Sequence, residues 1–170
     1  HLIWLRAPLP PIRDSVTISG ASQPGFDGRP LINLHDAAHA GVVLDFQGEG
    51  ADGSVIEALR ISGFVGVGLR LNDVDGVRIE NVDLSDAPGN YGQTAIQVLN
   101  GSDGVRVARV DVSGVTQGVV VRESADPRIE ASAFRDVESE GIYLADVGPL
   151  AVGAVRGNRF DGSATAVRLA

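Results

Sequence analysis

Four side chains on repeated strand-like segments have the chemistry to bind a sugar chain: Arg70, Gln97, Arg122 and Tyr143. A guanidinium forms paired hydrogen bonds with a carboxylate, so Arg70 and Arg122 could bind uronate groups. The ring of Tyr143 could stack on a pyranose. The spacing predicts one outward column with Gln97 and Tyr143 and a second with Arg70 and Arg122. The alternative, which we favour at this point, is a hydrated sheet face on which arginine stems cover apolar neighbours.

Two pairs of carboxylates recur at equivalent positions of successive repeats. Stacked strands would place Asp83 and Asp111 about 4.8 Å apart at the backbone, and Glu80 and Glu130 about 9.6 Å apart. These separations bracket the range of about 5 to 9.5 Å that glycosidases use. Any two acids in a stacked column have such spacings, however, and arginines occupy or flank both columns. A charge-balanced surface is therefore the better interpretation, and the catalytic residues, if any, stay unknown.

A column of aspartates at predicted turns has the chemistry for calcium. Asp52, Asp75 and Asp103 each precede a glycine, and Asp126 precedes a proline. Repeated aspartates bind Ca²⁺ in some parallel β-rods, where the ion takes about 6 to 8 oxygen ligands. Aspartate before glycine is also the ordinary residue of a tight turn. We expect no metal or other cofactor, with Asp75, Asp103 and Asp126 as the calcium candidates if one binds.

The segment from Gly48 to Gly53 matches the G-x-G-x-x-G pattern of dinucleotide-binding proteins. That pattern works only where a helix follows, because the helix N-terminus binds the pyrophosphate. Residues 54–62 instead have the pattern of a short strand, and Glu49 and Asp52 would repel a phosphate. We therefore expect no nucleotide to bind.

The histidines also fail to make a site. His35 and His39 would share one face if their segment were helical, but zinc needs three or four ligands and only His1 remains. A surface loop is the better interpretation of this segment. The same scarcity of histidine leaves no recognisable Ser/His/Asp arrangement.

The elements that would position these side chains are short strands in a repeat. Six segments share the order small residue, apolar residue, any residue, then Leu or Val, and each begins 23 to 29 residues after the one before. Repeats of this length cannot bury a core alone and must stack. The segments are Gly41–Leu44, Gly66–Leu69, Ala95–Val98, Gly118–Val121, Gly141–Leu144 and Ala166–Leu169.

A second pattern advances in step with the first and is seen in Ile56/Leu59/Ile61, with a weaker copy in Ile129/Ser132/Phe134. Both patterns alternate with period two, so each repeat is a coil of strands that pair in parallel with the next coil. The prediction is an all-β solenoid of about six or more coils of 22–29 residues, with irregular N-terminal coils over 1–40 and regular coils over 41–170. Its predicted interior contains Val42, Leu44, Val67, Leu69, Ile96, Val98, Val119, Val121, Ile142 and Leu144.

Composition narrows the function classes. The net charge is −8, all 14 basic residues are arginine and they form no cluster, so nucleic acid is a poor candidate partner. Zero cysteines exclude disulfides and thiolate metal sites. No apolar run approaches the roughly 20 residues of a membrane-spanning helix, so membrane insertion is not expected.

The N-terminal segment resembles that of secreted bacterial right-handed parallel β-helix repeat proteins of the pectate-lyase-like superfamily. The residues that carry the resemblance are Pro8–Ile12, Val16–Gly20, Ser22–Gly25 and Pro30–Leu34. One departure is Ser19, where an aspartate is usual before the glycine, and another is the missing portion that normally starts the rod. The resemblance implies a right-handed coil and an extracellular or cell-surface location in bacteria.

Members of that superfamily include polysaccharide lyases, glycosidases, adhesins and surface proteins, so the resemblance does not select a function. The sequence favours a non-catalytic rod, either a spacer or adhesin element, with polysaccharide as a candidate partner. The alternative is a polysaccharide lyase or glycoside hydrolase acting on acidic polysaccharide. Because residues 166–170 end inside a strand pattern, we also expect further coils or a cap of a parent chain to cover the C-terminal end.

Overall fold

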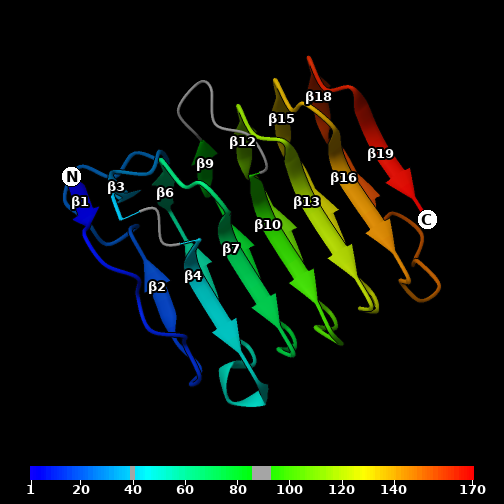
Figure 1. The fold of residues 1–170 in the computed structure, drawn as a ribbon, viewed down its shortest axis with the longest axis horizontal. Helices are drawn as coiled ribbons and strands as arrows, with labels where there is room; N and C mark the ends of the chain where they lie inside the picture. Colours follow the sequence, from blue (N-terminus) through cyan, green and yellow to red (C-terminus); the bar gives the residue numbers. More distant parts are fainter. Residues whose placement is uncertain (39–40, 86–92) are drawn as a thin grey trace.

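The computed structural model describes residues 1–38, 41–85 and 93–170. Within them the chain winds as a solenoid, and each turn adds one strand to each of three parallel sheets (Figure 1). The turns advance in sequence order from the N-terminus at one end to the C-terminus at the other. The predicted all-β parallel solenoid is therefore confirmed.

The three sheets are named A, B and C. Sheet A contains β1 (Leu2–Leu5), β3 (Ile32–Asp36), β6 (Leu59–Ser62), β9 (Asp83–Ser85), β12 (Asp111–Ser113), β15 (Ala133–Arg135) and β18 (Arg159–Asp161). Sheet B contains β4 (Val42–Gln47), β7 (Val67–Asn72), β10 (Thr94–Leu99), β13 (Gln117–Arg122), β16 (Glu140–Ala145) and β19 (Thr165–Leu169). Sheet C contains β2 (Thr17–Ser19), β5 (Val55–Glu57), β8 (Arg78–Glu80), β11 (Arg106–Ala108), β14 (Arg128–Glu130) and β17 (Val155–Arg156). A short 3₁₀ turn, η1 (Glu49–Ala51), joins β4 to β5.

The core is a set of aliphatic stripes that run along the solenoid axis. On sheet A the pairing places Leu34, Ile61, Leu84, Val112, Phe134 and Phe160 over one another. The last two rings stack with centroids 5.1 Å apart. On sheet C the stripe is Ile18, Ile56, Ile79, Val107, Ile129 and Val155. Both stripes follow the predicted spacing of the second pattern.

The register predicted for sheet B is wrong by two residues between its second and third strands. Leu69 pairs with Ile96 and Leu71 with Val98, so Leu44 and Leu69 lie in a different stripe from Val98, Val121 and Leu144. All five side chains are buried, but in two adjacent stripes. The missing members of the second stripe are Phe46 and Leu71. Val42 and Val67, predicted inside, are half-buried; they pair with each other, and Val67 also pairs with Thr94.

The cause of this error lies near the start of strands β4, β7, β10, β13 and β16. Two consecutive residues are buried there, such as Val43 with Leu44 and Ala95 with Ile96, so the period-two pattern fails locally. The first residue of each pair faces the interior and is small in the later coils. These positions are Val43, Gly68, Ala95, Gly118, Gly141 and Ala166. The small residue that matches Ala95 is therefore Gly68, whereas the prediction used Gly66.

The corner between sheets C and A is built from residues in the left-handed backbone region. Ala58, Asn81, Arg109 and Ala131 have φ between 51° and 55°. Each donates its backbone N–H to a carbonyl of the next coil, as Asn81 does to Ala108 at 3.1 Å. These bonds offset part of the cost that the left-handed region imposes on residues with a Cβ. The corner also places Asn81, Arg109 and Ala131 in one column that is partly or fully exposed, whereas Ala58 is buried.

Ser132 is the polar residue in the weaker copy of the second pattern, Ile129/Ser132/Phe134, and its hydrogen bonds explain why it fits an apolar position. Its hydroxyl donates to the Glu130 carbonyl at 2.9 Å and accepts the Val110 N–H at 3.2 Å. A buried hydroxyl with both bonds made carries little desolvation cost. Ser132 thus links two coils where the other copies have only an apolar contact.

The N-terminal residues form a coil of the same topology. The predicted strands at 15–19 and 31–34 correspond to β2 and β3, and Ile12 forms an isolated parallel bridge to Phe46 beside sheet B. Strand β1, which the sequence did not predict, extends sheet A by pairing with β3. Residues 20–30 leave the coil as a loop between β2 and β3.

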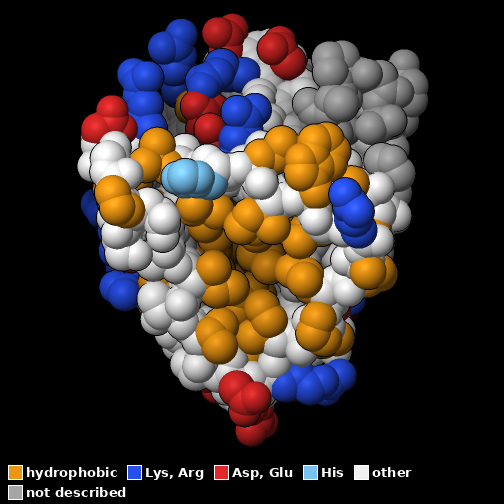
Figure 2. All heavy atoms as spheres, turned by 90° about the vertical axis from the view of Figure 1, so that its left-hand side faces the viewer, with side chains coloured by type: hydrophobic (Ala, Val, Ile, Leu, Met, Phe, Trp, Pro, Cys, Tyr) orange, Lys and Arg blue, Asp and Glu red, His pale blue; other side chains and the backbone are white. Residues whose placement is uncertain are grey.

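Both ends of the solenoid leave apolar side chains uncovered. At the N-terminal end Leu2, Ile3, Trp4 and Leu9 are exposed, and Figure 2 shows apolar side chains filling the middle of this end. At the C-terminal end every residue of β19 is exposed, including Leu169. The core therefore stops at each end without a covering layer among the described residues.

Candidate functional site

The outer face of sheet B brings the four predicted sugar-binding residues together, but in different columns from those predicted. Arg70, Gln97 and Tyr143 share one column, which begins with Asp45 and ends with Arg168. Arg122 lies in the next column, level with Ala145. The prediction already placed Asp45 beside Arg70, and the two-residue register shift after β7 moves both of them into the column of Gln97 and Tyr143.

Arg70 is held by Asp45 in a bidentate ion pair. Its Nε and one terminal nitrogen donate to the two carboxylate oxygens at 2.8 and 2.6 Å. The hydrogen bond to Asp45 is the largest influence on Arg70 and raises its pKa further above its ordinary value. A lyase base would need the opposite shift, because it must accept a proton. Arg70 is therefore a structural cation on this face.

Tyr143 lies between two arginines on neighbouring coils. The guanidinium carbon of Arg122 is 5.0 Å from the ring centroid and that of Arg168 is 5.6 Å from it. Both distances are within the range of cation–π attraction. Arg122 is exposed, and no carboxylate of the described residues forms an ion pair with it. Among the described residues, the Arg122 guanidinium of this face is thus able to form further hydrogen bonds. The sequence did not indicate its contact with the ring of Tyr143.

Glu140 is a buried residue at the start of strand β16 and binds neighbouring side chains of this face. Its buried carboxylate accepts hydrogen bonds from the Ser139 hydroxyl at 2.6 Å, the Gln117 amide at 3.1 Å and an Arg168 nitrogen at 3.1 Å. The bond from Ser139 is the largest of the influences that lower the pKa of Glu140. Glu140 therefore fixes Arg168 on one side of Tyr143.

Glu140→Gln is expected to destabilise the fold by about 2 kcal/mol at neutral pH, because the charged acceptor of three donors is lost. The folded pKa lies below the unfolded one, so the stabilisation is complete above the unfolded value of about 4.3 and is lost as the pH falls through the folded pKa. Urea unfolding at pH 7 and pH 3 measures both effects. Glu49→Gln, at an exposed carboxylate of η1, is the control and should leave the stability at pH 7 unchanged. An equal loss at both pH values would contradict the assignment.

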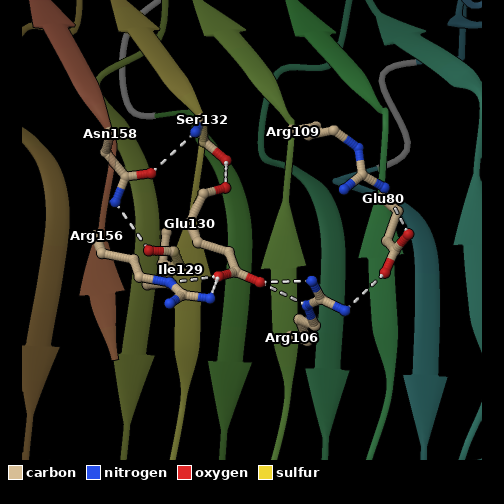
Figure 3. A network of polar contacts seen from close by, with 8 residues as sticks. All are labelled: Glu80, Arg106, Arg109, Ile129, Glu130, Ser132, Arg156 and Asn158. Carbon is tan, nitrogen blue, oxygen red and sulfur yellow. Dashed lines mark hydrogen bonds and ion pairs between the residues drawn. The ribbon is translucent and has the colours of Figure 1, made fainter. Parts of the chain in front are cut away.

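The outer face of sheet C carries a network of alternating charges (Figure 3). Arg106 bridges Glu80 and Glu130, with nitrogen–oxygen distances of 3.4 and 2.6 Å, and Arg156 contacts the second oxygen of Glu130 at 2.6 Å. Arg109 reaches Glu80 at 2.7 Å. The bonds from Arg156 and Arg106 lower the pKa of Glu130. The predicted Glu80/Glu130 pair is therefore part of an ion-pair ladder in which both carboxylates are bound by arginines.

Asp83 and Asp111 pair directly on β9 and β12 of sheet A, as the sequence predicted. Asp111 forms an ion pair with Arg135, whereas Arg60, the residue before Asp83 in the column, donates to Ser85 at 3.0 Å. Burial, and next the charge of Asp111, raise the pKa of Asp83. The two carboxyls thus differ in their surroundings.

The turn aspartates form a ladder of hydrogen bonds between coils. Oδ1 of Asp52 accepts the Asp75 N–H and Oδ1 of Asp75 accepts the Asp103 N–H, both at 2.8 Å. Asp103 accepts the Ala125 N–H at 2.6 Å, so Asp126 lies one residue beyond the predicted column, with φ of 48° where the other turns have glycine. No group of three or more His, Cys, Asp or Glu side chains in the described part of the chain is close enough to hold a metal.

The two remaining motifs have ordinary structural surroundings. The segment from Gly48 to Gly53 forms η1 and leads into strand β5, so no helix N-terminus faces a phosphate there. His35 lies in β3, 3.1 Å from the Ser62 hydroxyl through Nδ1, and its ring meets Trp4 edge-on. His39 lies outside the described residues.

Comparison with known proteins identifies the fold family of the chain. The family model described as a right-handed β-helix region matches residues 40–169. No curated protein and no solved structure matches the chain. Among the described residues, no helix has the length and apolar character needed to cross a membrane.

Proposed function

We propose that this chain, which belongs to the family of right-handed β-helix regions, is a non-catalytic rod that binds acidic polysaccharide along the outer face of sheet B. The observation that carries the proposal is the cluster of Arg122, Tyr143 and Arg168, in which two guanidiniums lie against one ring. Arginine favours bidentate recognition of carboxylates, and uronate units present them in series along a sugar chain.

The neighbouring residues support a binding surface in preference to a catalytic one. Arg70 is committed to Asp45, and Glu140 holds Arg168. Gln97 lies between the paired Arg70 and the cluster and offers an amide donor and acceptor to sugar hydroxyls. Arg70 and Arg168 are fixed by hydrogen bonds to Asp45 and Glu140, so these two side chains would need little ordering on binding.

The wider setting of the proposal is a secreted or cell-surface bacterial protein in which this rod acts as a spacer or adhesin element. The resemblance of the N-terminal segment supports this setting. The uncovered edge of β19 supports further coils or a cap of the parent chain at the C-terminal end, because an open strand edge invites pairing.

The binding proposal predicts that Arg122→Ala combined with Tyr143→Ala weakens binding to polygalacturonate by about tenfold, the effect expected when a charge-assisted hydrogen bond is lost. Affinity electrophoresis in gels with polygalacturonate or neutral dextran measures this. Arg78→Ala, an exposed arginine on sheet C, is the matched control and should bind as the parent does. The binding should also weaken with salt.

Two results would overturn this proposal. Equal retardation by dextran and polygalacturonate would show that charge recognition is absent. Release of new reducing ends, or of unsaturated products that absorb in the ultraviolet, would show that the chain is a glycoside hydrolase or lyase.

A further inference from the structure

A hollow of about 610 Å³ lies on a different face of the solenoid, between loop 20–30 and the outer side of sheet A. Its lining comes from the loop and from three successive coils around the corner of sheets C and A: Gly28, Arg29, Pro30, Asn81, Val82, Asp83, Arg109, Val110, Asp111, Ala131 and Ala133. A volume of this size is within the range of small-molecule sites, about 300 to 1,000 Å³.

The hollow exists because two neighbouring columns lose their long side chains in the same coil. The sheet A column runs Asp83, Asp111, Ala133, and the corner column runs Asn81, Arg109, Ala131. In the third of these coils each column has a methyl group after two polar residues, and on sheet A the next coil has Arg159 in this column. Loop 20–30 forms the opposite wall, and the Asn81 amide fixes it by donating to the Gly28 carbonyl at 3.0 Å.

The charges of the side chains that line the hollow balance, but only some of these side chains form ion pairs. Its two arginines and two aspartates cancel. The guanidinium of Arg109 is held by Glu80, and Asp111 is paired with Arg135. Among the described residues, neither a hydrogen bond nor an ion pair reaches the Asp83 carboxyl or the Arg29 guanidinium. Within the described residues, the hollow thus offers one carboxylate and one exposed guanidinium that accept or donate no hydrogen bond, although the charges of Arg60 and Arg135 also act on Asp83.

We propose that this hollow binds a neutral oligosaccharide, with Asp83 accepting sugar hydroxyls and Arg29 donating to them. A charge-balanced lining gives no advantage to an ion of either sign, whereas a partly desolvated carboxylate without donors gains from hydroxyl groups. The sugar is separate from the acidic polysaccharide of sheet B, so the two proposals stand or fall independently. A donor from the ligand would also lower the raised pKa of Asp83.

The test is a titration of the ¹⁵N-labelled chain with maltotriose, cellotriose and mannotriose, followed through amide shifts. At least one should bind with a Kd of about 1 mM and shift the amides of residues 81–83, 109–111 and 131–133. Asp83→Ala should raise that Kd about tenfold, and Ala133→Tyr should abolish binding by filling the hollow. Asp161→Ala, an exposed aspartate of sheet A outside the hollow, is the matched control.

The proposal is overturned if none of the three sugars shifts these amides, or if the shifts persist in both Asp83→Ala and Ala133→Tyr. Stronger binding of trigalacturonate at the same amides would overturn the neutral class of ligand. If Ala133→Tyr fails to fold, Asp83→Asn replaces it, and unchanged affinity in that variant counts equally against the proposal. The Arg122→Ala and Tyr143→Ala double variant should retain this binding, which separates it from the sheet B site.

Discussion

Leu69→Asp is expected to unfold the central coils of the solenoid, with a loss of at least about 4 kcal/mol. Leu69 is fully buried between Leu44 and Ile96 in the same stripe. Truncating such a side chain alone costs about 2 to 5 kcal/mol, and the new carboxylate is also left without a partner in the core. Small domains have about 5 to 15 kcal/mol of stability in total, so most of it is removed. Far-ultraviolet circular dichroism during urea unfolding measures the loss.

The control uses the same change on the other side of the same sheet. Leu99 points outward from β10, beside Asn72 of β7, and its side chain is only half-buried. Leu99→Asp should change stability by no more than about 1 kcal/mol, because the carboxylate stays in water. Similar losses in the two variants would mean that the inward and outward faces of sheet B are assigned wrongly.

The sequence predicted the register of sheets A and C correctly because turns pin it there. Asp-Gly turns precede β5, β8 and β11, and a residue in the left-handed region directly follows each of these strands, so Ile56 and Ile79 could only stack. Hydrophobic spacing and turn spacing agree at these positions. The Glu80/Glu130 and Asp83/Asp111 relations followed directly.

Sheet B lacked such a constraint, and this is where the site prediction failed in part. Gly66 and Gly68 both fit the small position, and the paired burial of Val43 with Leu44 hides the alternation that would choose between them. The stripe of small residues from Gly68 to Ala166 is the signal that could have fixed the register. With it, the pairing of Arg70 with Gln97 in one column would have been predictable.

The hollow beside sheet A could not be predicted from the repeat. Its floor follows from the two columns that have alanine at positions 131 and 133, but its wall depends on the path of loop 20–30. A contact between residues 53 positions apart, from Asn81 to Gly28, sets that path. Repeat patterns carry information about equivalent positions in neighbouring coils, and a loop outside the repeat has no equivalent.

Gly118→Ala is expected to destabilise the fold by about 3 kcal/mol, the upper part of the range for overpacking a core. A Cβ at this position would lie 2.2 Å from the Gly141 carbonyl oxygen and 2.7 Å from Cδ1 of Phe134. The carbonyl belongs to strand β16, which pairs with the strand of Gly118, and the ring stacks on Phe160. Neither neighbour can move without breaking a sheet contact or an aromatic contact. Thermal and urea unfolding both measure the loss.

Gly148→Ala provides the comparison, because the same methyl group meets only Cβ of Ala125, at 3.7 Å, which is an ordinary contact. Its backbone lies outside the left-handed region, so alanine should be neutral or slightly stabilising there, by up to about 1 kcal/mol. The difference between the two variants therefore isolates the close approach of β13 to β16. If Gly118→Ala were as stable as Gly148→Ala, the small-residue stripe would not be a packing requirement, and the register of sheet B would lose its physical explanation.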